Sequence, residues 1–136
     1  VFYFDRFVCC MSFGRPTRQS AKQEFEISRM ASVSDIHVFA IWSKILKLFI
    51  IDHNPKSIVT YSDNRLFSGK VYENLGFSFG GYVKPDYYWS LNNKRYHKSS
   101  LRKEKNSSLT ESQLRESQGY RKIWDLGKKR WVKDLM

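Results

Sequence analysis

The stretch at residues 60–79, T-Y-S-D-N-R-L-F-S-G-K-V-Y-E-N-L-G-F-S-F, decides the fold. It begins inside an apolar run at 57–61 that predicts a strand, and a polar Asp-Asn-Arg loop follows at 63–65. Residues 68–75 predict a short helix, which Gly76 ends before a new strand starts at the next residue. The order of strand, polar loop, helix and strand is typical of an α/β unit.

The flanking sequence predicts further strands and helices around this unit. A strand at 24–30 alternates apolar Phe25 and Ile27 with polar neighbours, and apolar residues at helical spacing predict a helix at 39–52. The other expected elements are strands 1–4 and 7–13 joined at 5–6, a hairpin of 82–83 with 87–91, a turn at 92–94, a helix at 111–117 that begins with a Thr110–Gln113 capping box, and a terminal hairpin of 120–125 with 129–132. This order favours an α/β arrangement with helices on both faces of the sheet.

Several motifs carry a family resemblance. The ending Y-E-N-L-G-F at 72–77 is similar to one that recurs in GCN5-type N-acetyltransferases, which share the GNAT fold. Six ordered motifs resemble a phage and large-virus group that is commonly labelled homing-endonuclease-like: M-S-F-G-R-P (11–16), E-I-S-R (26–29), S-K-I-L (43–46), Y-S-D-N-R (61–65), K-P-D-Y-Y (84–88) and G-Y-R-K-I-W-D-L-G (119–127).

The resemblance implies a GNAT-like α+β fold with a mixed, mostly antiparallel sheet, followed by a C-terminal helix and hairpin. We expect a GNAT-like core at 1–93 and a basic C-terminal extension at 94–136 packed on the same domain. Full-length members of the resembled group have a strand and helices before the point where this chain starts, so we also expect an N-terminally truncated chain or a degraded gene.

Net charge points to a polyanionic partner. The 136 residues contain 24 Lys and Arg against 13 Asp and Glu, which gives a formal charge of +11. Nucleic acid, DNA first, is the expected partner, because such a charge concentrates polyanions near the surface. The expected phosphate-binding residues are Lys94, Arg95, Lys98, Arg102, Lys103, Lys105, Arg121, Lys122, Lys128, Lys129 and Arg130. The interleaved Tyr96, Tyr120, Trp124 and Trp131 either stack on bases or form the core.

A donor-binding site is expected at the start of the helix at 39–52. Acyltransferases of this fold hold the donor pyrophosphate there on backbone amides, which requires small residues. Ser43 and Lys44 are the candidate cofactor-binding residues, or else ordinary polar helix residues. The bulk of Phe39, Ile41 and Trp42 predicts that this cradle is blocked, so no cofactor is expected, with acetyl-CoA or a related acyl-CoA as the alternative.

Asp63, Arg65 and Tyr72 are the other candidate site residues. Asp63 and Arg65 follow a buried strand at the end where α/β sheets place ligands, so Asp63 is a candidate base and Arg65 a candidate phosphate partner. The alternative is that Asp63 caps the loop before Ser68 and that Arg65 pairs with Glu26 or with Asp63 itself. Tyr72 lies where some acyltransferases keep a general-acid tyrosine, and a core position explains it equally well.

Other classes of site are not supported by the sequence. Cys9 and Cys10 are adjacent, and the three histidines have no spacing that suits zinc, so no metal site is expected. Nuclease signatures are absent, and no apolar run reaches the roughly 18 residues of a membrane span. We expect a soluble intracellular protein without a membrane partner, in the host cytoplasm if the chain is viral.

Three functional hypotheses follow. The first is a DNA-associated GNAT-like module of a phage or mobile-element protein, which binds the nucleic-acid backbone through a basic C-terminal face. The second is an acyl-CoA-dependent or related transferase that modifies a nucleobase or an amine. The third is an inactive remnant or a structural component of a larger assembly.

Overall fold

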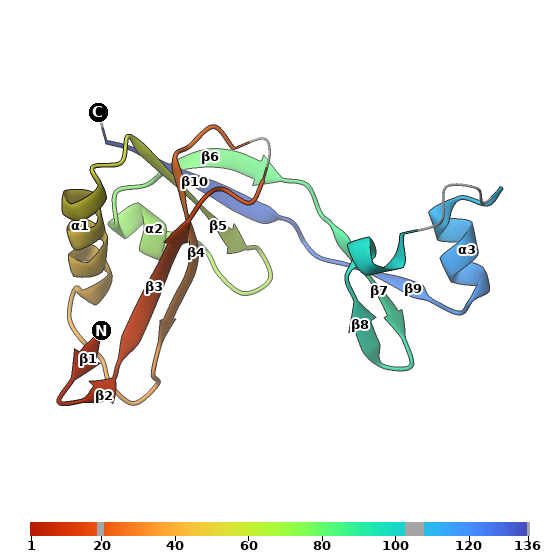
Figure 1. Ribbon diagram of the computed structural model, residues 1–136, viewed down its shortest axis with the longest axis horizontal. Helices are drawn as coiled ribbons and strands as arrows, with labels where there is room; N and C mark the ends of the chain where they lie inside the picture. Colours follow the sequence, from red (N-terminus) through yellow and green to blue (C-terminus); the bar gives the residue numbers. More distant parts are fainter. Residues whose placement is uncertain (19–20, 103–107, 136) are drawn as a thin grey trace. The chain divides into compact units, whose positions relative to one another are not determined.

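A computed structural model describes residues 1–18, 21–102 and 108–135 (Figure 1). The described residues form an α+β fold with three α-helices and three sheets, in which most strand pairs are antiparallel. The chain divides into two compact units: unit 1 comprises the described part of 1–83 and 128–136, and unit 2 comprises the described part of 84–127. The boundaries of these units lie at 84 and 128, whereas the sequence suggested a boundary at 94. The expected domains at 1–93 and 94–136 stay a prediction.

Unit 1 is built on a five-stranded sheet with the order β3-β4-β5-β10-β6. Its strands are β3 (Cys9–Gly14), β4 (Phe25–Ser32), β5 (Ser57–Asp63), β10 (Lys128–Asp134) and β6 (Ser78–Val83). The pair of β4 with β5 is parallel, and the other neighbours are antiparallel. Strands β1 (Phe2–Tyr3) and β2 (Arg6–Phe7) form a separate small hairpin. Its turn is at Phe4 and Asp5, both at positive φ, one residue before the predicted turn, and the strand predicted at 7–13 is divided between β2 and β3.

Two helices of unit 1 pack on the same face of its sheet. Ile27, Ile58 and Trp131 lie on one face of the sheet because strand side chains alternate. They form the core with residues of helix α1 (Ile41–His53) and of the α2 segment, by which we mean helix α2 (Lys70–Asn74) and the residues up to Phe77. The prediction of helices on both faces is therefore wrong. The described loop residues 15–18 and 21–24 lie against the opposite face instead, where the Thr17 amide donates to Glu26 at 2.8 Å and Arg130 donates to Gln23 at 3.0 Å.

The predicted local elements of unit 1 are confirmed. Helix α1 starts two residues later than expected, and Asn54 ends it in the left-handed conformation just before Pro55. Helix α2 is shorter than predicted, and Gly76 ends the turn that follows it at φ 78°. Strand β5 runs two residues past its expected end, to Asp63.

Two predicted hairpins are wrong. Strand β6 does not pair with β7 (Tyr87–Leu91), and the two segments of the expected terminal hairpin, β9 (Arg121–Trp124) and β10, do not pair with each other. Strand β10 pairs with both β5 and β6. This position buries Trp131 to 2 % exposure, and burial of such a large side chain favours the long-range pairing over a local hairpin.

The described part of unit 2 is a three-stranded antiparallel sheet with the order β8-β7-β9 and one α-helix. Strand β8 (Lys94–Tyr96) follows a tight turn in which Asn92 and Asn93 both have positive φ, as their residue type favours. The predicted capping box starts helix α3 (Glu111–Ser117), and a 3₁₀ helix spans Lys98–Leu101. Trp89 is fully buried at the centre of this unit.

Among the described residues, no helix has the length and apolar character needed to cross a membrane.

Candidate functional sites

The parallel strands of unit 1 separate after a short paired stretch. Strands β4 and β5 are aligned at three positions, of which Ile27 with Thr60 is the last, although β4 continues to Ser32 and β5 to Asp63. The Thr60 hydroxyl donates to the Ile27 carbonyl at 3.1 Å and so closes the paired part. Figure 1 shows the two strands turning apart beyond it. A sheet that opens in this way leaves room for a ligand between its strands.

A cleft of about 740 Å³ occupies the opening. Residues from both strands, from the loop at 15–18 and from α2 line it. Its ionisable and phenolic side chains are Arg18, Glu26, Arg29, Tyr61, Asp63, Tyr72 and Lys128. The cleft therefore combines cations, which suit an anionic ligand, with hydroxyl groups that can donate or accept a hydrogen bond.

Asp63 lies in the cleft but is held by Arg65. The Arg65 side chain donates to both carboxylate oxygens, at 2.9 and 3.2 Å, and the Arg65 amide donates at 2.9 Å. These hydrogen bonds lower the pKa of Asp63 to about 2. Such a carboxylate is a weak base at neutral pH, so the geometry supports the structural alternative, in which Asp63 organises its own loop. Arg65 also lines a separate open hollow with Lys129.

Tyr72 lies both against the core and at the wall of the cleft. Its ring packs near those of Phe77 and Trp131, with centroids 6.0 and 6.2 Å away, and it also lines the cleft. A core tyrosine at a cleft wall is fixed in position by its neighbours. The catalytic role of Tyr72 stays a prediction.

Sequence reasoning missed Tyr61. It is the residue after the last β4–β5 pair and lines the cleft, and the Arg18 guanidinium lies 5.1 Å from its ring centroid. Burial raises the pKa of Tyr61 and the Glu26 carboxylate raises it further, while Arg18 and Arg130 act in the opposite direction. The available signal was its place at the carboxyl end of the parallel strand, next to Asp63, where α/β sheets bind ligands.

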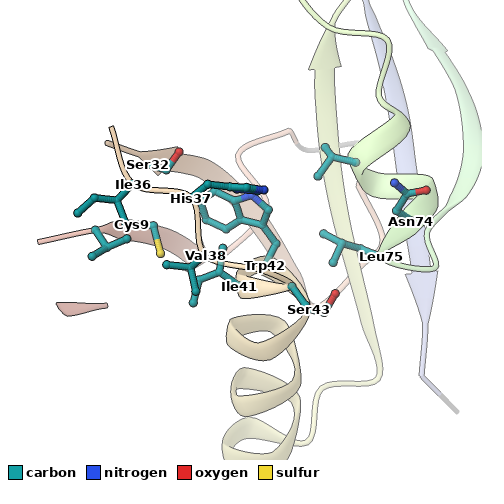
Figure 2. A pocket seen from close by; sticks show the side chains of 13 residues that line it. Cys9, Ser32, Ile36, His37, Val38, Ile41, Trp42, Ser43, Asn74 and Leu75 are labelled. Carbon is teal, nitrogen blue, oxygen red and sulfur yellow. The ribbon is translucent and has the colours of Figure 1, made fainter. Parts of the chain in front are cut away.

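A second pocket, of about 200 Å³, lies at the start of α1. Figure 2 shows Trp42 and Ser43 in the first turn of the helix, with Asn74 and Leu75 across from them. Ser43 thus reaches the expected place, whereas Lys44 is exposed and does not line the pocket.

The predicted blockage at the start of α1 is only partly present. Phe39 is 86 % exposed and lines neither cavity, so the prediction that its bulk fills the cradle is wrong. Ala40, the residue between Phe39 and the helix, has the left-handed backbone conformation. Trp42 does line the pocket, and because it also lines the larger cleft it forms a wall common to both.

The residues expected to bind nucleic acid fall into both units. Unit 1 holds Lys128, Lys129 and Arg130; Lys103 and Lys105 lie outside the described residues; unit 2 holds Lys94, Arg95, Lys98, Arg102, Arg121 and Lys122.

Three of the expected cations bond to side chains of their own unit. Lys98 pairs with Asp86 at 2.7 Å and thereby lowers the pKa of that carboxyl. Lys122 donates to Ser112 at 2.6 Å, and Arg130 donates to Gln23. The exposed cations in the described part of unit 2 are Lys84, Lys94, Arg95, Arg102 and Arg121.

The aromatic residues proposed for stacking are mostly part of the cores. Trp131 is buried, while Tyr96 and Tyr120 pack against each other at 5.6 Å and are half-buried. Trp124 is the exception, at 57 % exposure. In the part of the chain that the structure describes, no cluster of three His, Cys, Asp or Glu side chains is placed to hold a metal ion.

Comparison with known proteins adds no relative: no protein-family model matches this chain, and no curated protein matches it either.

Proposed function

We propose that unit 1 is a GNAT-like domain. Two features support this. The chain passes from β4 through α1 to a parallel β5, and the two strands then diverge around a cleft. Helix α1 also starts at a pocket, where the resembled fold places its donor phosphates.

We propose that the chain is a nucleic-acid-associated module, in which unit 2 provides the main contact surface. The charge of unit 2 carries this proposal: residues 84–127 contain ten Lys or Arg against five Asp or Glu. Five of these cations, which were named above, are exposed. A cationic surface of this kind binds phosphate backbones through counterion release, which is largely independent of base sequence. The resemblance to homing-endonuclease-like phage and viral proteins agrees with a DNA-directed role.

A salt series tests this function. Fluorescence anisotropy with labelled duplex DNA, single-stranded DNA and RNA is measured between ~50 and ~300 mM salt, and the proposal expects affinity that falls steeply over this range. Arg102→Glu with Arg121→Glu, both in unit 2, weakens binding and flattens the salt slope by roughly 0.7–0.9 for each phosphate that the variant no longer neutralises.

A control pair distinguishes unit 2 from general charge. Lys47→Glu with Lys70→Glu makes the same change of charge at exposed positions of unit 1 and leaves binding largely unchanged. Absence of binding to all three nucleic acids at low salt would contradict the proposed function. Equal weakening by both pairs would contradict the assignment of unit 2 as the contact surface.

A second candidate, an acyl-CoA-dependent or related transferase, is favoured by the cleft. Cations, phenols and a neighbouring helix start surround a volume of several hundred Å³, which suits a phosphorylated donor and a small acceptor. Acetyl-CoA then raises the melting temperature of the chain by mass action. Arg29→Gln in the cleft reduces that increase, whereas Lys47→Gln on the exposed side of α1 does not. An unchanged melting temperature at millimolar acetyl-CoA would remove this candidate.

A further inference from the structure

The sheet of unit 2 has two chemically different faces. Trp89 and Lys122 are directly opposite each other, so they share a face, and the Lys122 ammonium donates to Ser112 of α3. Tyr120 also packs against the Trp89 ring, at 6.4 Å. Helix α3 therefore lies on this side, which we call the helix face. The alternate residues of the three strands project from the other side, which we call the open face.

The open face carries two cross-strand rows. In the first row, Ser90 of β7 is opposite Arg95 of β8 on one side and Arg121 of β9 on the other. In the second row, Tyr88 is opposite Ile123, and the His97 ring lies 5.6 Å from the Tyr88 ring on the other side. These paired positions contain no Asp or Glu.

The side chains of the open face are accessible. Arg95, Arg121, His97 and Ile123 are exposed, and Tyr88 is partly exposed. The Arg95 guanidinium lies 3.6 Å from the centroid of the Tyr88 ring, which is a stacking distance. The guanidinium covers one face of the ring, so a base stacks on the outer plane of the guanidinium or on the exposed part of the ring, and the Arg95–Tyr88 pair as a whole is the stacking platform. It offers a flat π surface and a positive charge at the same place.

The chemistry of the two rows selects the ligand. Arg95 and Arg121 flank the central strand, roughly 10 Å apart at two strand spacings, and both can donate bidentate hydrogen bonds to phosphate. The Tyr88 row beside them offers stacking to a flat ring. Bases of a duplex are already stacked on one another and do not present their faces, whereas bases of a single strand do. The arrangement of the face thus favours an unpaired strand over a duplex.

We infer that the open face of the β8-β7-β9 sheet binds single-stranded nucleic acid, with a base on Tyr88 and the backbone phosphates at Arg95 and Arg121. This inference rests on the proposed nucleic-acid function and names the form of nucleic acid and the residues that recognise it. Tyr88 thus takes the stacking role that the sequence suggested for Tyr96 and Tyr120. Those two side chains pack against each other and are half-buried.

The test uses three variants of the full chain and one matched control. Tyr88→Leu keeps apolar bulk but removes the ring, while Arg95→Gln and Arg121→Gln remove one charge each. Lys47→Gln is the control, because it removes the same charge from an exposed residue of unit 1 that is not among the expected nucleic-acid-binding residues. Far-ultraviolet circular dichroism checks that each variant is folded. The ligands are labelled oligo-dT and oligo-U of about 12 nucleotides, together with a DNA hairpin duplex.

The expected result is a selective weakening of single-strand binding. Tyr88→Leu weakens oligo-dT or oligo-U binding by roughly 5- to 100-fold, the range typical of removing one aromatic ring on which a base stacks. Each arginine variant weakens binding and reduces the salt slope by about 0.7. Lys47→Gln changes affinity by about twofold or less, because Lys47 is not part of the proposed contact surface and a single solvated charge outside that surface is screened. The comparison of oligo-dT with oligo-U shows whether the strand is DNA or RNA.

Three results would overturn the inference in distinguishable ways. Nucleic-acid binding that is the same in the wild type and in all three face variants would reject the open face and leave the proposed function intact. Weaker binding by the arginine variants but not by Tyr88→Leu, with duplex bound more tightly than single strands, would reject the single-strand specificity. Absence of any binding at low salt would reject both the inference and the proposed function.

Discussion

Gly69, at the start of α2, lies directly against the Trp131 indole of β10. A Cβ atom at residue 69 would lie 2.8 Å from the indole Nε1 and closer still to two ring carbons. Gly69 also has φ +88°, which other residues adopt at a cost. This packing joins the loop after β5 to the strand that completes the sheet, so it couples two parts of unit 1 that are far apart in the sequence.

We expect Gly69→Ala to destabilise unit 1 by roughly 3 kcal/mol or more, because overpacking against a buried ring adds to backbone strain. Two other glycines separate these causes. Gly81→Ala has φ +106° but open space around its Cβ, so about 1 kcal/mol of strain is expected, and Gly14→Ala has neither strain nor close atoms and is nearly neutral. Urea denaturation of the three variants measures the order. Equal losses of unfolding free energy in Gly69→Ala and Gly81→Ala would show that the Trp131 indole moves to make room for the added methyl group.

The buried hydrogen bond between Trp131 and Ser62 gives a second prediction. The indole Nε1 donates to Ser62 Oγ at 2.9 Å, and both residues are 2 % exposed. Ser62→Ala leaves a buried donor without its partner and should cost about 1–3 kcal/mol. In a Trp131→Phe background the donor is absent, and the same substitution should cost less than about 0.5 kcal/mol. A double-mutant cycle by urea denaturation measures the difference, and a coupling near zero would contradict this account.

The sequence predicted what local chemistry determines. Gly76, the Asn92–Asn93 pair and the Thr110–Gln113 capping box each specify one backbone conformation within a few residues, and the structure confirms all three. The alternation around Ile27 likewise identified the side of β4 that faces the core, although Glu26 on the other side is buried as well. These signals act at short range, so neighbouring residues suffice to recognise them.

The pairing of distant strands was not predictable in the same way. Val83 precedes a turn-like Lys-Pro-Asp segment and an aromatic strand, which is a local hairpin pattern, yet β6 pairs with β10 instead. The reason is the burial of Trp131, whose partners come from β5 and from the α2 segment. The free energy gained by burying Trp131 depends on residues that are far apart in the sequence.

The candidate site also has one part that depends on neighbouring residues and one part that depends on distant strands. The pairing of Asp63 with Arg65 is local and was one of the two alternatives drawn from the sequence. The cleft itself depends on where β4 and β5 cease to align, after Ile27 and Thr60. No residue pattern marks that point. The place of Tyr61 at the carboxyl end of its strand indicates a ligand-binding edge, but it does not tell which side chains of that edge line the cleft.

Acid should weaken the loop after β5. The pKa of Asp63 is lowered to about 2 in the folded chain, chiefly by the Arg65 side chain, from an ordinary value of 3.8. A lowered carboxyl pKa stabilises the folded state above the unfolded pKa, and this contribution is lost as pH falls from about 5 toward 2. The pair is partly exposed, at 22 and 41 % for its two side chains, so solvent screening reduces the contribution to about 1 kcal/mol or less.

The pH dependence of a variant tests this. Arg65→Gln should lower the free energy of unfolding by about 0.5–1 kcal/mol at pH 7 and have little effect near pH ~1, below the pKa of about 2 that Asp63 has in the folded wild-type chain. Guanidinium denaturation at the two pH values measures the difference. An effect that is equally large at both pH values would mean that Arg65 acts through packing.

Helix α3 gives a prediction specific to unit 2. The backbone amide of Gln113 donates to the Thr110 hydroxyl at 3.3 Å, and the backbone amide of Thr110 donates to the Gln113 side-chain oxygen at 3.0 Å. Thr110→Ala should destabilise unit 2 by about 1 kcal/mol, because the Gln113 amide then has no side-chain acceptor at the helix start. Ser117→Ala, at the exposed last turn of the same helix, should be close to neutral because Ala favours the helix. Amide hydrogen exchange within α3 measures the difference for this unit alone. Faster exchange is expected in Thr110→Ala but not in Ser117→Ala. Equal exchange in the two variants would show that packing of α3 on the helix face, rather than its cap, holds the helix in place.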